Sequence, residues 1–188
     1  MADISIASTL RPTAAAVEPA SAASEPYFDL IELLFFAYRD FVGDPDEVLA
    51  KLGFGRAHHR VLHFVNRNPG MKVADLLDVL KITKQSLGRV LKQLIDEGYV
   101  VQKEGANDRR QRLLYVSPVG EALALKLAGL QTARIAGVLA ELGPGAREAA
   151  RRFLAGMIDA GDRDHVLRLI ARSDALAVRA RTRPSDAS

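Results

Sequence analysis

The sequence has no cysteine and no tryptophan, and aromatic residues make up only 6% of its 188 residues. The absence of cysteine excludes disulfides, zinc-finger sites and thiol-based redox switches. Residues 1–25 have neither a basic start nor an apolar core, which argues against a secretory signal, and their acidic residues argue against a transit peptide. No apolar run looks long enough to cross a bilayer. We therefore expect a soluble, cytoplasmic protein with no membrane partner.

The composition that remains favours a helical protein with a real core. Hydrophobic residues account for 48% of the chain, and leucine and alanine, which are good helix formers, dominate many segments. The formal net charge is +3, which permits binding to nucleic acid but does not establish it, because the placement of charge matters more than the total.

Periodicity and turn signals divide the chain into short helices around one hairpin. Residues 1–25 are rich in Ala, Ser and Pro and are expected to be disordered, and residues 173–188 to form a flexible tail. Gly43-Asp44-Pro45 is predicted to end the first helix and begin a second. The predicted helices span residues 27–42, 45–52, 56–66, 73–80, 83–97, 118–142, 146–160 and 163–171, and the predicted strands span 99–101 and 113–116.

The segment from Thr83 to Gly98 has the two faces that a DNA-reading helix needs. Thr83 is a good N-cap, and Gly98 a good stop. Leu87, Val90, Leu91, Leu94 and Ile95 form an apolar face that can pack on the domain. The polar face can read base edges, since Gln pairs with adenine and Arg with guanine; its members are Lys84, Gln85, Ser86, Arg89 and Gln93. Gly88 lies on the outer side, where it could let the backbone approach DNA closely.

The hairpin that follows has a cationic loop. Asn107, Asp108, Arg109, Arg110 and Arg112 lie between the two strands. Such a wing can place an arginine in the narrow minor groove, where the potential is most negative. Asp108 is then expected to orient Arg110 rather than contact DNA, because phosphates repel carboxylates. Helix, strand, basic loop, strand and new helix together predict a winged helix-turn-helix.

Two other classes of function stay open at this point. An amphipathic helix can present an ordinary solvated face, so the domain could be a winged-helix protein-interaction module without base-specific reading. The arginine-rich wing argues against that alternative. An enzyme is not expected, because no spacing of Ser, His and Asp forms a nucleophile elbow or a metal site.

The wing and its flanks resemble the MarR family of bacterial transcription regulators. The family's wing signature, D-x-R followed five residues later by L-[ST]-x-x-G, is matched by Asp108 to Arg110 and by Val116-Ser117-Pro118-Val119-Gly120, with Val in place of Leu. Thr83, Ser86, Arg89, Leu94, Gly98 and Val100 fit its recognition-helix pattern. The likeness extends over residues 27–171 and is greatest for the PetP-type regulators.

The resemblance implies a fold, a partner and a target. The fold is mainly α with a small β-hairpin wing: a winged helix-turn-helix lobe at about 54–117 and a helical dimerisation base at about 27–42 and 118–172, within a domain of residues 26–172. The partners are a second copy of the chain and a palindromic double-stranded DNA operator, and a repressor is the expected role. The base is expected to use Phe28, Ile31, Phe35, Tyr38, Leu123, Leu127, Leu130, Phe153, Ile158, Leu167 and Ile170, which could alternatively form the core of a monomer.

The resemblance also implies a small-molecule effector that releases DNA from a cleft between base and lobe. The candidate lining residues are Phe35, Tyr38, Arg39, His59 and His63, although aromatic residues at helical spacing are more often core. His59 and His63 are four residues apart and share one helix face, so they could bind a metal or haem iron. Surface or packing histidines are the more common explanation, and no cofactor is expected.

Overall fold

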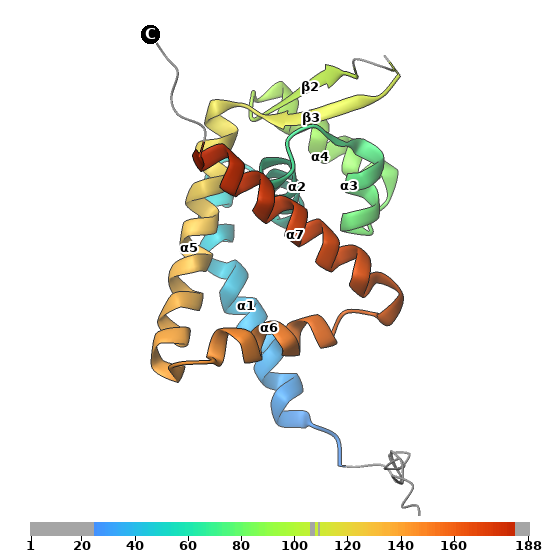
Figure 1. Ribbon diagram of the computed structural model, residues 1–188. Helices are drawn as coiled ribbons and strands as arrows, with labels where there is room; N and C mark the ends of the chain where they lie inside the picture. Colours follow the sequence, from blue (N-terminus) through green and yellow to red (C-terminus); the bar gives the residue numbers. More distant parts are fainter. Residues whose placement is uncertain (1–24, 106–107, 109, 183–188) are drawn as a thin grey trace, which may run out of the picture.

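The computed structural model describes residues 25–105, 108 and 110–182, so the expectation for residues 1–24 lies outside the described residues. Within them the chain forms seven helices and a three-stranded antiparallel sheet (Figure 1), which confirms the predicted fold class. The elements are α1 (Phe28–Ala50), α2 (Arg56–Arg67), β1 (Met71–Lys72), α3 (Val73–Leu80), α4 (Lys84–Asp96), β2 (Val100–Glu104), β3 (Arg112–Val116), α5 (Pro118–Leu142), α6 (Ala146–Gly156) and α7 (Ala160–Thr182).

A winged lobe contains most of the buried apolar side chains. It consists of α2, α3, α4 and the sheet, closed by the C-terminal part of α1 and the first part of α5. The apolar residues predicted for α4 are buried or partly buried in this core. Leu123 and Leu127 also belong to it. They were expected in a dimerisation base, but they pack inside the lobe of one chain because the first part of α5 packs against α2 and β3.

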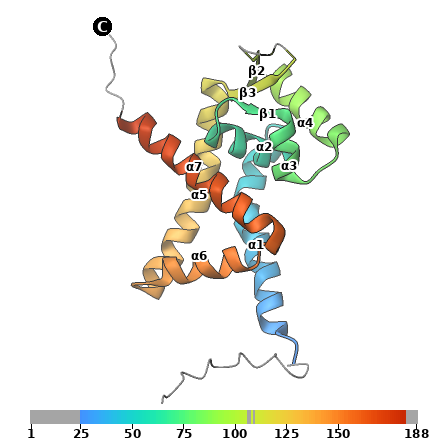
Figure 2. The same cartoon turned by 45° about the vertical axis from the view of Figure 1, so that its right-hand side comes forward.

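The sheet has the order β1-β3-β2, and β1 was not predicted. Met71 pairs with Leu114 and Lys72 with Leu113, whereas β2 and β3 pair from Val100–Val116 to Glu104–Arg112. A two-residue strand is too short to show an alternating pattern, so it exists only because β3 supplies its partners. The β2–β3 hairpin projects from one end of the molecule (Figures 1 and 2).

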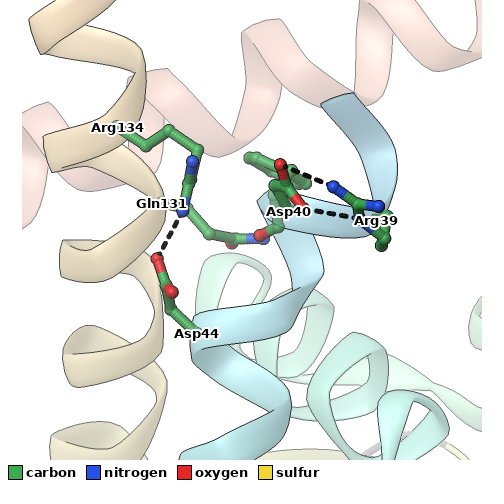
Figure 3. Close-up of polar contacts among 6 residues, drawn as sticks. Arg39, Asp40, Asp44, Gln131 and Arg134 are labelled. Carbon is green, nitrogen blue, oxygen red and sulfur yellow. Dashed lines mark hydrogen bonds and ion pairs between the residues drawn. The ribbon is translucent and has the colours of Figure 1, made fainter. Parts of the chain in front are cut away.

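The prediction that Gly43-Asp44-Pro45 separates two helices is wrong, because α1 continues through Pro45. Proline has no N–H, so the carbonyl of Phe41 loses its usual helical donor. Gln131 Nε2 on α5 donates to that carbonyl oxygen at 3.5 Å, and Arg134 Nη2 binds Asp44 Oδ2 at 2.9 Å (Figure 3). Pro45 itself is buried. Packing against α5 therefore keeps the helix continuous where local signals favoured a break.

Helices α5, α6 and α7 form a triangular frame below the lobe: α5 leads away from it, α6 crosses between α5 and α7, and α7 returns to it (Figures 1 and 2). By length and composition α5 could cross a membrane, contrary to the sequence-based expectation, and only 17% of its most apolar window is buried. Its early residues lie in the lobe core, and the exposed apolar ones include Leu125, Ile135, Val138 and Leu142.

The C-terminal helix is longer than predicted, and α6 is shorter. A flexible tail was expected from Ser173, but α7 runs from Ala160 to Thr182. Ser173 is buried, and its Oγ donates at 2.8 Å to Asn68 Oδ1, just beyond α2. Arg67 of α2 also forms an ion pair with Asp174. These contacts with the lobe extend the helix over a polar, arginine-rich segment whose composition had suggested disorder.

Candidate nucleic-acid interface

The predicted reading helix is α4, and its two faces are separated as the sequence indicated. Thr83 is its N-cap, with Oγ1 accepting the backbone N–H of Ser86 at 3.1 Å. The buried face includes Leu87, Leu91 and Leu94. On the opposite side Lys84, Gln85 and Arg89 are exposed and Ser86 is half-buried. The N-terminal half of α4 thus presents donors, acceptors and two cations to solvent.

The turn before α4 is held from α2. Lys81 adopts a left-handed conformation, with φ of 50°, between α3 and α4. Arg60 Nη2 of α2 donates at 3.0 Å to the carbonyl of Leu80, the last residue of α3. A guanidinium therefore fills the role of a C-terminal cap and fixes the direction in which α4 leaves the turn.

Gln93 does not belong to the outward reading face on which the sequence pattern placed it. Its side chain is half-buried, and its Oε1 lies 2.9 Å from His58 Nε2 on α2. Its Nε2 lies 2.9 Å from Glu97 Oε1 and 3.5 Å from the carbonyl of Gly53. Helical spacing identified the correct stripe, but α2 covers its C-terminal end, which the sequence of α4 alone could not reveal.

The wing is shaped by hydrogen bonds around Asp108. Its Oδ1 accepts the backbone N–H of Arg110 at 2.9 Å, and its carbonyl accepts that of Gln111 at 3.0 Å. Asp108 was expected to orient Arg110, and here it acts on the main chain of that residue. The Arg110 side chain is exposed, whereas Arg109 lies outside the described residues. Arg112 Nη1 is paired with Glu104 Oε1 across the hairpin at 2.9 Å, so part of its charge is already neutralised.

Ser117 and Gly120, which match the wing signature, join the start of α5 to the wing and to the end of the reading helix. Ser117 Oγ donates to the carbonyl of Gly98 at 2.6 Å and accepts the N–H of Gly120 at 3.1 Å. The Ser117 N–H donates to the carbonyl of Tyr99 at 3.0 Å. A Cβ on Gly120 would lie 2.0 Å from that same carbonyl oxygen, so no side chain fits there. The end of α4, the first residues of β2 and the start of α5 are therefore fixed together.

The predicted effector residues come from two helices, α1 and α2, and differ in exposure. Phe35, Tyr38 and Arg39 are exposed on α1, and Arg39 is paired with Asp40 at 2.7 Å (Figure 3). His59 is buried and His63 half-buried on α2. Burial lowers the pKa of His59, opposed by the charge of Asp46, and burial also lowers the pKa of His63, assisted by His59 and Arg67. Both rings are thereby favoured in the neutral form.

A cavity of about 670 Å³ lies elsewhere, between α7 and the α3–β1 side of the lobe. Its lining combines apolar and ionisable side chains and includes Lys72, Val79, His165, Leu169 and Arg172. Sequence periodicity missed this site because α7 was not expected to return to the lobe. Among the residues that the structure describes, no cluster of three histidine or carboxylate side chains could hold a metal ion.

Comparison with known proteins gives consistent matches. The family model described as MarR family matches residues 52–111. The chain is 44% identical over 135 residues to the HTH-type transcriptional regulator PetP of Rhodobacter capsulatus, an alignment that covers 72% of this chain and 81% of that protein.

Two solved structures have the same fold at low sequence identity. Streptococcus pneumoniae FabT in complex with DNA has a TM-score of 0.63 at 13% identity, covering 70% of this chain and 94% of that one. NadR in complex with 4-hydroxyphenylacetate has a TM-score of 0.60 at 20% identity, covering 76% of this chain and 99% of that one.

Proposed function

The chain belongs to the MarR family of DNA-binding transcription regulators, and we propose on that premise that it is a cytoplasmic, dimeric repressor that reads a palindromic operator. It is a regulator and not an enzyme. The observation that carries the proposal is the outward face of α4, where Lys84, Gln85 and Arg89 are exposed beside a hairpin whose tip presents Arg110. The α4 residues would enter the major groove and the wing would contact the flanking minor groove.

Selection of bound fragments from a genomic DNA pool, at physiological salt, tests the operator. A palindrome with half-sites about one helical turn apart supports a dimer that places two α4 helices in successive major grooves. Recovery of unrelated fragments with no shared motif would contradict sequence-specific reading.

Single substitutions distinguish the contribution of the wing to DNA binding from that of the reading helix. Arg110→Ala is expected to weaken binding to every duplex by about 1–3 kcal/mol and to reduce the salt dependence, with the base preference retained. Gln85→Ala and Arg89→Ala are expected to change the preferred bases. Arg151→Ala on α6, at the opposite end of the molecule from the wing (Figure 1), is the matched control. If Arg110→Ala leaves affinity and salt slope unchanged, the wing has no part in binding.

The proposed dimer rests on apolar side chains that one chain leaves uncovered. Phe28, Ile31, Phe35, Tyr38, Phe153 and Ile170 are exposed, and Leu130, Ile158 and Leu167 are partly exposed. Large apolar side chains are also exposed on α5, and exposed apolar side chains gathered in this number favour an interaction surface. We expect a second copy to cover it, and Phe35→Asp to produce monomers in sedimentation experiments. A wild-type protein that is monomeric while bound to its operator would contradict this.

We further propose that a small molecule regulates DNA binding. NadR, which has the same fold, binds 4-hydroxyphenylacetate in its crystal structure, and this supports the proposal. Two sites are candidates: the residues around Tyr38, His59 and His63, and the cavity under α7. With 4-hydroxyphenylacetate as the probe in an operator-release titration, Leu169→Trp should reduce the response if the cavity is used, and Tyr38→Ala if the α1 site is used. No effect of the probe on wild-type protein would exclude ligands of that chemistry.

A further inference from the structure

We propose that the hydrogen bond between His58 and Gln93 sets the orientation of α4 against the lobe, and so makes His58 and Gln93 positioning residues for base reading. This inference rests on the proposed role of α4 as the reading helix. His58 Nε2 lies 2.9 Å from Gln93 Oε1, and the link joins the first turn of α2 to the last turns of α4.

The direction of this bond is fixed by a second contact on the same ring. The backbone N–H of Gly55 donates to His58 Nδ1 at 3.1 Å, so Nδ1 carries no proton. In a neutral imidazole the proton is then on Nε2, which donates to Gln93 Oε1. Because Oε1 is the acceptor, the Gln93 amide nitrogen faces Glu97 Oε1 at 2.9 Å and the Gly53 carbonyl at 3.5 Å. Each of these hydrogen-bond donors therefore has an acceptor, and only one orientation of the Gln93 amide satisfies all of them.

The imidazole is also held in place by aromatic packing. The ring of Phe54 stacks on that of His58, with centroids 4.8 Å apart and planes 14° from parallel. Phe54 is buried, and its ring meets Tyr99 edge-on at 5.1 Å. Tyr99 follows α4 after only Glu97 and Gly98, so the stack contacts the segment just beyond the helix. The stacking therefore restricts the His58 ring, and the hydrogen bond from that ring to Gln93 holds the C-terminal end of α4.

The position of Gln93 along α4 makes its link relevant to base contacts. Gln85, Arg89 and Gln93 are spaced four residues apart and lie along one side of the helix. The first two are exposed, and the third is tied to α2. When the link is lost, α4 can tilt about its N-terminal end; Arg89 lies about 7.5 Å along the axis from Lys84 at that end, so a tilt of about 5° would move it by about 0.7 Å. Since hydrogen bonds to base edges tolerate only roughly 0.5 Å of variation in length, such a tilt would degrade reading.

The opposite end of α4 has its own tie to α2. Arg60 Nη2 donates to the carbonyl of Leu80 at 3.0 Å, before the turn that precedes α4. Helix α2 thus fixes α4 at both ends, at the turn through Arg60 and at the last turns through His58. Loss of the second tie leaves the helix attached and packed through its leucines, but free to tilt about its N-terminal end.

The test measures the ratio of affinities of the full-length protein for its selected operator and for an unrelated duplex. Gln93→Leu removes the acceptor and keeps a good helix former. We expect an approximately tenfold lower affinity for the operator, with unchanged affinity for the unrelated duplex and an unchanged salt slope, because phosphate contacts tolerate a small tilt better than base contacts. A variant that only lost stability would lower both affinities together.

His58→Glu provides the partner variant. Glutamate at the third helical position can still accept the Gly55 N–H, as in a capping box, but it has no proton to donate to Gln93. It should lower the affinity ratio as Gln93→Leu does, and the double variant should be no worse than either single one. Asp96→Asn, an exposed change on the same turn of α4, is the control and should move both affinities together.

An unchanged ratio in a folded Gln93→Leu protein, with Arg89→Ala still altering the ratio, would overturn this inference and leave the proposed function intact. Effects of His58→Glu and Gln93→Leu that multiply in the double variant would also overturn it, because two residues in one link cannot act independently. A wild-type protein that shows no preference for any duplex would instead contradict the proposed function.

Discussion

Similar apolar side chains are buried in the winged lobe but exposed on the base helices, which are α1, α5, α6 and α7. In the lobe, Leu62, Leu94 and Leu114 have no exposed surface. On the base helices, Phe35 is 68% exposed and Leu33 is 62% exposed. The lobe completes its core within one chain, whereas the base carries apolar faces that no other residue in the described part of the chain covers. Helical periodicity marks an apolar face in both regions but does not say which surface will cover it.

The two regions should also differ in how freely their elements can move relative to one another. The lobe holds α4, the wing and their ties to α2 in one packed unit. In the proposed dimer the base would change only together with the surface of the second copy, so we expect the base to set the distance between two reading helices and the lobe to set the orientation of each helix.

The largest expected effect is loss of the lobe core. Leu62→Ala removes a fully buried side chain and should lower the free energy of unfolding by about 2–5 kcal/mol, at any protein concentration. Leu33→Ala on α1 is the matched change in the base. Its cost should appear as a greater dependence of the thermal midpoint on protein concentration, since a partner chain stabilises by mass action. Equal, concentration-independent losses in both variants would remove the distinction between the regions.

The second effect is at the junction of wing, reading helix and α5. Gly120→Ala places a Cβ 2.0 Å from the backbone oxygen of Tyr99, which cannot rotate away. We expect a loss of about 1–3 kcal/mol in urea denaturation, together with weaker operator binding, because β2 must shift relative to α5. A Gly120→Ala protein as stable as wild type would show that this junction is looser than its hydrogen bonds indicate.

More of the lobe than of the other helices could be predicted from the sequence, because the helix caps and stops of the lobe are local signals. The N-cap at Thr83, the stop at Gly98 and the Ser117-Pro118 start are each set by the residue's own chemistry, and the structure has all three. Where tertiary contacts override local signals, prediction failed. Pro45 lies inside α1 because Gln131 replaces its missing donor, and α7 extends past Ser173 because α2 binds it.

The sequence predicted which residues of α4 face outward, but not the contacts that α4 makes with other elements. The exposure of Lys84, Gln85 and Arg89 follows from the apolar stripe of α4, so the sequence was sufficient to place them outward. Gln93 was misplaced because its inward direction depends on His58, 35 residues earlier. The cavity under α7 depends on two segments about 100 residues apart, which no periodicity connects.

A smaller effect, of opposite sign, is expected at Gly88. It is exposed in the middle of α4, and a Cβ there would meet nothing within 4 Å. Gly88→Ala should therefore stabilise the lobe by about 1 kcal/mol through helix propensity. If the backbone at Gly88 lies against DNA, the same methyl should weaken operator binding. Gly161→Ala in α7, remote from α4, is the control for binding; a Gly88→Ala protein that is more stable and binds normally would show that glycine is not needed for close approach.

The smallest change predicted here concerns pH and the two α2 histidines. Burial lowers the pKa of His59 and of His63 in the folded chain below the ordinary value of about 6.5. At lower pH the unfolded chain therefore binds more protons at these two residues than the folded one. Their contribution to the free energy of unfolding should be constant above about pH 7 and fall as the pH decreases through about 6.5 toward the folded values. Denaturation midpoints between pH 7.5 and 5.5 would show this slope, and the double variant His59→Leu/His63→Leu should have a shallower one. An identical slope in the double variant would mean that these rings titrate alike in both states, and the lobe would then owe its acid sensitivity to other groups.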